Sequence, residues 1–329
     1  MNEAFEGVQR ARGEIAPSDL ERAAAMLAAV KTQVGRVYIG PSINIEALMV
    51  ALLSRGHILL EGVPGIAKTT LVKAFAEVIA ASYRRVQFTP DLLPSDITGT
   101  YILDMRDNKF VLRRGPIFAN IVLGDEINRA PAKTQSALLE AMQERQVTIE
   151  GVTQELPAPF MVLATQNPVE QEGVYMLPEA QLDRFLIKLT MGYPSFEDEV
   201  AVMRTHAQPT SEVDVVMTES DVKAMSELAS RVHMDEELFS YIVNLVRFTR
   251  EHQQTDLGAS PRAAIALMKG AKSRALLKGR DYVVPDDIRA LSSLVLAHRM
   301  ILSPEAELNG YTGAGVVRQA LESVRYGKG

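Results

Sequence analysis

The sequence contains no cysteine among its 329 residues, so neither a disulfide nor a metal site with thiolate ligands can form. It also lacks a long hydrophobic run. Its apolar stretches are short and interrupted, so we expect no segment that spans a bilayer. Residues 1–6 are acidic and lack the apolar core of a secretory signal. Together these absences favour a cytoplasmic protein.

Positive charge is scarce as well. Lysine and arginine number 35 against 41 aspartates and glutamates, which gives a net charge of −6 at pH 7. This balance excludes a global basic field of the kind that attracts nucleic acid. The composition, 47% hydrophobic and 23% charged, is typical of a globular protein. The length allows two domains, each with its own core.

Short apolar runs alternate with helical stretches in the first two thirds of the chain. The predicted strands lie at 58–60, 86–88, 121–123, 160–164 and 186–189. Most of these runs are continuous rather than alternating, as is typical of parallel strands covered by helices on both faces. We therefore predict an α/β domain over 1–209, with an N-terminal helix at about 18–35 and a further helix at about 69–81.

The strand signal fades after a polar linker at 208–212 that contains Pro209. Ser260-Pro261 has the pattern of a helix N-cap followed by proline at the first helical position. Val284-Pro285 opens another helix. One-sided apolar spacing supports a further helix through Leu238, Phe239, Ile242, Leu245 and Val246. The sequence predicts a smaller, all-helical domain over 210–329.

A glycine-containing loop joins the first predicted strand to its helix. Backbone N–H groups of such a loop, together with the helix N-terminus, form an anion site. Lys68 would reach the β- and γ-phosphates of a nucleotide, and the Thr69 hydroxyl would bind Mg²⁺. Ala67 stands where glycine is usual, and we expect its backbone to be near-helical already, so that its methyl is tolerated. The predicted ATP-binding residues are Gly62, Val63, Pro64, Gly65, Ile66, Ala67, Lys68, Thr69 and Thr70.

Two carboxylates end the strand at 121–123. Asp125 would hold Mg²⁺ through its water shell, and Glu126 would polarise the attacking water. Such a pair is common alone, but about 55 residues after a phosphate loop it indicates an ATPase. Asn167 follows the next strand, where its amide can reach a γ-phosphate or the attacking water. Asn167-Pro168 is also typical of a simple turn.

Two arginines are further candidates. Arg184 lies at the end of a helix that Pro178 begins, where it can stabilise the helix C-terminus. Arg262 lies in the first turn of a helix, where a cation opposes the helix dipole unless an anion is nearby. Each could stabilise charge on a transferring phosphoryl group, and the alternative is a solvated surface arginine.

The order of these motifs resembles that of AAA+ ATPases and, more narrowly, of the MoxR family, from about residue 35 to 329. Ala67 is similar to the MoxR form of the phosphate loop. Gly124 is less bulky than expected and predicts a looser strand end. The stretches that carry the resemblance are Glu61–Thr69, Gln87–Gly99, Asp125–Ala130, Ala164–Pro168 and Leu177–Phe185.

The resemblance implies a role for each candidate residue. Lys68 and Thr69 match Walker A, Asp125 and Glu126 match Walker B, and Asn167 matches sensor 1. Arg184 matches an arginine finger that enters a neighbouring subunit's site, and Arg262 matches sensor 2.

The resemblance also implies a homo-oligomer, expected as a hexameric ring, that hydrolyses ATP with Mg²⁺ at subunit interfaces. The energy would remodel or mature protein clients, or insert cofactors or metals into them. Clients with von Willebrand factor A domains are among those implied.

Two β-hairpins are predicted as insertions, one at 100–112 and one at 146–156 around Gly151. The resemblance implies that they face a ring pore or a partner; as an alternative they are scaffold loops.

Two other functions stay open. A nucleic-acid motor of the helicase type would use the basic cluster Arg106, Lys109, Arg113 and Arg114, although the acidic balance opposes it. A motor subunit like that of magnesium chelatase is the other.

Overall fold

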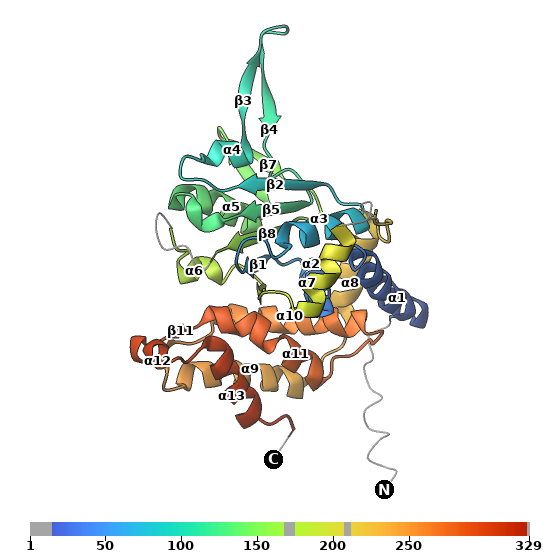
Figure 1. The fold of residues 1–329 in the computed structure, drawn as a ribbon, viewed down its shortest axis with the longest axis vertical. Coiled ribbons are helices and arrows are strands. Elements are labelled where there is room, and N and C mark those ends of the chain that lie inside the picture. Colours follow the sequence, from blue (N-terminus) through green and yellow to red (C-terminus); the bar gives the residue numbers. More distant parts are fainter. Residues whose placement is uncertain (1–14, 168–174, 207–211, 328–329) are drawn as a thin grey trace. The chain divides into compact units, whose positions relative to one another are not determined.

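The computed structural model describes residues 15–167, 175–206 and 212–327. This part of the chain forms two compact units, one of residues 29–223 and one of residues 15–28 together with 224–327 (Figure 1). Helix α1 (Pro17–Val34), predicted at about 18–35, contributes residues to both units. The predicted domain boundary between residues 209 and 210 lies outside the described residues and stays a prediction.

A five-stranded sheet forms the centre of the 29–223 unit. Its order is β2-β5-β8-β1-β9, and every pair is parallel, which confirms the predicted α/β class. The strands are β1 (Ile58–Glu61), β2 (Tyr83–Gln87), β5 (Ile121–Asp125), β8 (Met161–Gln166) and β9 (Ile187–Thr190). Because parallel strands all end at the same edge, side chains that follow β1, β5 and β8 meet there.

Helices and apolar side chains enclose this sheet. Its helices are α2 (Ser42–Leu53), α3 (Lys68–Val78), α4 (Pro94–Thr98), α5 (Ala132–Glu144), α6 (Glu179–Leu182) and α7 (Phe196–His206), with a 3-10 turn η2 (Ile127–Arg129). The apolar face predicted for α3 is buried at Leu71, Val72, Phe75 and Val78. Helix α3 ends before the predicted residue 81 because Ala80 takes a left-handed conformation, φ 48°.

Both predicted hairpins are confirmed. Strands β3 (Gly99–Asp104) and β4 (Lys109–Arg114) pair antiparallel along their whole length, and Figure 1 shows them extending away from the sheet. Strands β6 (Gln146–Ile149) and β7 (Val152–Glu155) form the second hairpin, with Gly151 in the turn.

The looser strand end predicted at Gly124 is not found. Gly124 is buried and lies between Val86 of β2 and Ala164 of β8 in the sheet. A β-carbon at this position would lie 3.2 Å from Phe88 Cε2 and 3.4 Å from Leu138 Cδ2. Phe88 and Leu138 therefore take up the space that a larger side chain would occupy.

The second unit is helical, as predicted, with one short addition. Its helices are α8 (Glu219–Arg231), whose first residues belong to the other unit, α9 (Glu236–Glu251), α10 (Pro261–Leu277), α11 (Pro285–Leu296), η3 (Ala297–Arg299), α12 (Pro304–Leu308) and α13 (Gly313–Ser323). Strands β10 (Thr255–Leu257) and β11 (Ile301–Leu302) pair antiparallel. They are too short to give a recognisable alternation in the sequence.

A buried ion cluster fastens α10 to the start of α11. The Asp287 side chain is fully buried and accepts hydrogen bonds from Arg274 (2.6 Å) and Arg280 (2.7 and 2.8 Å). It also accepts from the backbone N–H of Val284 at 3.0 Å, which satisfies a free donor at the helix N-terminus. Across the described ranges of the chain, no helix combines the length and the apolar character needed to cross a membrane.

Candidate active site

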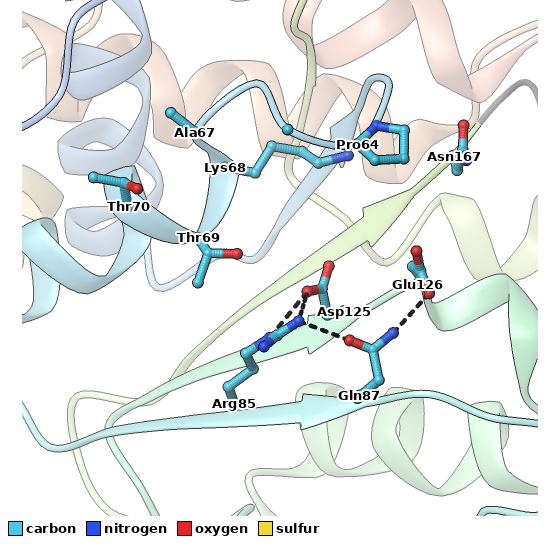
Figure 2. Close-up of a pocket in the computed structure, with 11 residues that line it drawn as sticks. Pro64, Ala67, Lys68, Thr69, Thr70, Arg85, Gln87, Asp125, Glu126 and Asn167 are labelled. Carbon is cyan, nitrogen blue, oxygen red and sulfur yellow. Dashed lines mark hydrogen bonds and ion pairs between the residues drawn. The ribbon is translucent and has the colours of Figure 1, made fainter. Parts of the chain in front are cut away.

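A pocket of about 380 Å³ lies at the edge of the sheet where the parallel strands end, within the 29–223 unit (Figure 2). Its volume is in the range of small-molecule sites. The lining residues come from the loop after β1, from α3, and from the ends of three other strands: Pro64, Gly65, Ala67, Lys68, Thr69, Thr70, Arg85, Gln87, Asp125, Glu126 and Asn167.

The loop between β1 and α3 depends on two glycines for its path. At Gly62 a β-carbon would lie 2.5 Å from the carbonyl oxygen of Met191, so only glycine fits without a backbone shift. Gly65 has φ 84°, a backbone conformation that residues with a β-carbon rarely adopt. The Lys68 Nζ donates to the carbonyl oxygen of Gly62 at 2.5 Å, which folds the lysine back over the loop.

The backbone conformation of Ala67 differs from the near-helical one that the sequence predicted. Its backbone is left-handed (φ 59°, ψ 22°) rather than near-helical, and it caps the N-terminus of α3. The β-carbon raises the energy of this conformation by roughly 1–2 kcal/mol, which explains why glycine is usual here. The chain must turn at this residue to bring the loop onto the helix N-terminus, a requirement that side-chain pattern does not reveal.

Lys68 has an unusual environment. Burial lowers the pKa of its ammonium group, and the charges of Asp125 and Glu126 act against that shift. Partial desolvation of a cation favours a nearby anion. The first turn of α3 also supplies backbone N–H groups without partners in the helix. This end of the pocket is suited to phosphate.

The Asp125 carboxylate is held by contacts to both of its oxygens. Its Oδ2 accepts from Arg85 Nε at 3.0 Å and from Arg85 Nη2 at 2.7 Å (Figure 2). Its Oδ1 accepts from the Thr165 hydroxyl at 2.6 Å. The same Thr165 oxygen accepts from the backbone N–H of Glu126 at 2.8 Å. Strands β2 and β8 thus fix the carboxylate from either side of β5.

Glu126 lies at the start of η2 in a left-handed conformation, φ 56° and ψ 51°. Its Oε2 accepts from Gln87 Nε2 at 2.6 Å and pairs with Arg129 Nε at 3.3 Å. Strain of this kind is found where a side chain must be held in a particular place. Here the strain and the contacts direct a carboxylate into the pocket.

Most of the predicted site residues meet in this pocket. Gly62, Val63 and Ile66 do not line it, and Gly62 instead shapes the loop. Arg184, half-buried just after α6, and Arg262, the second residue of α10, are also absent from the lining. Arg262 belongs to the other compact unit.

Sequence reasoning missed Arg85 and Gln87 as site residues. They alternate with the buried Val86 on β2, so both side chains lie on one face of the strand. Gln87 pairs in register with Asp125. Because Val86 is the one buried residue of β2, the alternation of Arg85 and Gln87 about it was the available signal that these two polar side chains share a face.

Comparison with known proteins agrees with this geometry. The model of the ATPase family associated with various cellular activities (AAA) matches residues 57–187, and that of the AAA lid domain matches residues 247–320. Chaperone MoxR1 of Mycobacterium tuberculosis is 44% identical over 301 residues, covering 89% of this chain and 80% of that protein. The chain belongs to the MoxR family of AAA+ ATPases.

Other relatives agree with this assignment. The uncharacterized protein YeaC of Bacillus subtilis is 49% identical to this MoxR-family chain, covering 89% of the chain and 92% of YeaC. The crystal structure of a protein from Cytophaga hutchinsonii, described as a proposed ATPase, superimposes with a TM-score of 0.89 at 42% identity and covers 94% of this chain and 98% of that one. The α/β domain and helical lid expected from the family are therefore both present.

Proposed function

We propose that this MoxR-family chain hydrolyses ATP in the described pocket and uses the energy to remodel or mature partner proteins. The observation that carries the proposal is the gathering, in one pocket, of a glycine-shaped loop at a helix N-terminus, a lysine and two carboxylates. The chaperone name of the Mycobacterium tuberculosis relative supports protein clients.

The phosphate end of ATP would lie against residues 62–70. Lys68 supplies a positive charge, and backbone N–H groups at the start of α3 supply hydrogen bonds. Within the described residues no group of three or more His, Cys, Asp or Glu could hold a metal. Thr69 and Asp125, which both line the pocket, would hold Mg²⁺, and so small a protein contribution suits an ion that keeps several waters and binds phosphates. When bound, Mg²⁺ would neutralise charge on the phosphate oxygens.

Glu126 would orient the attacking water and take its proton. The water oxygen forms a bond to the γ-phosphorus, the bond to the β–γ bridging oxygen breaks, and ADP leaves with that electron pair. Asn167, buried at the end of β8, lines the same pocket and would hold the water or the γ-phosphate through its amide. The roles of Glu126 and Asn167 are thus positioning and proton transfer next to the γ-phosphate.

Arg184 would act on a neighbouring subunit. Its place in the Leu-Asp-Arg-Phe stretch matches the arginine finger of the family, and it does not line the pocket of its own chain. We therefore propose a homo-oligomer, most simply a hexameric ring, with ATP at the subunit interfaces. Arg262 would contact the nucleotide from the lid and couple hydrolysis to the lid's position.

Apolar side chains on the β3–β4 hairpin support a protein client. Met105 is 84% exposed and Phe110 is 71% exposed. Large apolar groups that remain in water on a projecting element are typical of protein contact surfaces. Clients with von Willebrand factor A domains, and insertion of cofactors or metals, are the finer proposals.

The test is Mg²⁺-dependent ATP hydrolysis per protomer, measured against protein concentration. Wild type should turn over faster per protomer as concentration rises. Arg184→Ala should lose turnover and keep nucleotide binding, and Glu126→Gln should do the same at every concentration. Arg84→Ala removes an exposed arginine outside the pocket and serves as the matched control.

The two arms fail separately. Turnover that depends on neither concentration nor Arg184 describes a self-contained ATPase, and the trans role of Arg184 would then be wrong. Unchanged turnover in Glu126→Gln would remove Glu126 from the proton-transfer role.

A further inference from the structure

We propose that Arg85 is a built-in counter-cation of Asp125 that makes nucleotide binding less dependent on divalent metal. The inference rests on the proposed function of the pocket. Two cations can pair with the Asp125 carboxylate: the Mg²⁺ ion that accompanies the nucleotide, and the guanidinium group of Arg85 on β2.

Two donors of Arg85 converge on one oxygen of Asp125. Nε and Nη2 lie 3.0 Å and 2.7 Å from Oδ2, and Thr165 occupies Oδ1. The Asp125 side chain is 13% exposed, whereas that of Arg85 is 49% exposed. The carboxylate is thus held within the sheet, whereas about half of the arginine side chain remains in solvent.

Arg85 also reaches the second carboxylate through one intermediate. Its Nη2 donates to Gln87 Oε1 at 2.8 Å, and Gln87 Nε2 donates to Glu126 Oε2 at 2.6 Å (Figure 2). Because one guanidinium nitrogen serves both Asp125 and Gln87, withdrawal of Arg85 from Asp125 also removes a partner from Gln87. The state of Asp125 is linked in this way to the orientation of Glu126.

A divalent cation that takes Asp125 as a ligand competes with Arg85 for the same carboxylate. A positive charge 2.7 Å from Oδ2 repels a second cation there, so a metal ion binds at Asp125 more weakly while Arg85 stays in place. With no metal present, the charge of Arg85 adds to that of Lys68, which lines the same pocket, and offsets the phosphates of a nucleotide. Arg85 should therefore strengthen binding of metal-free nucleotide and weaken binding of the metal complex.

The readout is a ratio of two dissociation constants for a fluorescent ADP analogue. The Kd measured with excess EDTA is divided by the Kd measured with excess Mg²⁺. Arg85→Gln should raise this ratio about tenfold over wild type, the size expected for one charge contact at a half-exposed site. Arg84→Gln removes the same charge from the neighbouring residue on the other face of β2, outside the pocket lining, and should leave the ratio unchanged.

Arg85→Lys keeps the charge and loses the two-donor contact. Its ratio should lie between those of wild type and Arg85→Gln, which preserves the test if the glutamine variant does not fold. Circular dichroism establishes the fold of each variant.

A ratio that falls, because only the Mg²⁺ complex binds more weakly, would mean that Arg85 merely positions Asp125 as a metal ligand, and the inference would be wrong. An unchanged ratio in Arg85→Gln would also overturn it. If wild type binds no nucleotide in either condition, the failure lies with the proposed function instead.

Discussion

The environment of His57 predicts that the free energy of unfolding depends on pH. The loss of stability should begin at a pH well above that of ordinary acid unfolding. The residue precedes β1 and is buried, and its Nδ1 accepts a hydrogen bond from the Val162 backbone N–H at 2.9 Å. Nε2 must then carry the proton, and it donates to the Met142 carbonyl oxygen at 2.9 Å. Burial, with a smaller contribution from the charge of Arg145, lowers the pKa of His57 to about 4.

The direction follows from proton binding in the two states. The unfolded chain takes up a proton on His57 near its ordinary pKa of about 6.5, whereas the folded chain stays neutral until about 4. Between these values the unfolded state holds the extra proton, so the free energy of unfolding falls as pH falls. In full, the free energy of unfolding falls by about 3 kcal/mol, and about 1.4 kcal/mol of this is already lost at about pH 5.5.

The assay is urea unfolding followed by far-UV circular dichroism at about pH 7.5 and about pH 5.5. His57→Gln provides the reference, because glutamine offers a donor and an acceptor but does not titrate. The variant should be less stable at the higher pH, yet wild type should lose about 1.4 kcal/mol more between the two pH values. Equal losses in both proteins would refute the reasoning, because other titrating groups are common to both.

Three further substitutions test the packing and the backbone. Asp287→Asn should lower the free energy of unfolding of the helical unit by about 3 kcal/mol, since two arginines lose a buried charged partner, and urea unfolding at neutral pH should detect it. Ala67→Gly should raise the free energy of unfolding by about 1 kcal/mol because glycine accepts the left-handed backbone. A lower free energy of unfolding, which is the usual result of replacing alanine by glycine inside a helix, would contradict the observed conformation. Gly62→Ala should cost about 1–3 kcal/mol in the same assay and weaken nucleotide binding, because its β-carbon meets a backbone carbonyl, and unchanged stability would show that the loop has room.

Several features of the site were predictable because their signals are local. The loop after β1 is recognisable from its own glycines, lysine and threonine between an apolar run and an amphipathic helix. Asp125 and Glu126 stand directly after a buried strand, and parallel strands must end at a common edge. Both hairpins follow from alternation about a turn. The roles of Arg184 and Arg262 remain predictions, since they depend on a second copy or on the other compact unit.

What the sequence determined by itself was the family, the parallel α/β domain with its helical lid, and most of the residues that meet at the pocket, because apolar periodicity and motif order are properties of neighbouring residues. Tertiary structure alone decided three features. Arg85 faces Asp125 because β2 and β5, 40 residues apart in sequence at these positions, are neighbours in the sheet. Gly124 is packed tightly because Phe88 fills its space. Ala67 is left-handed because the chain must turn onto α3 there, and backbone conformation of this kind is set by the path of the whole loop rather than by the residue that adopts it.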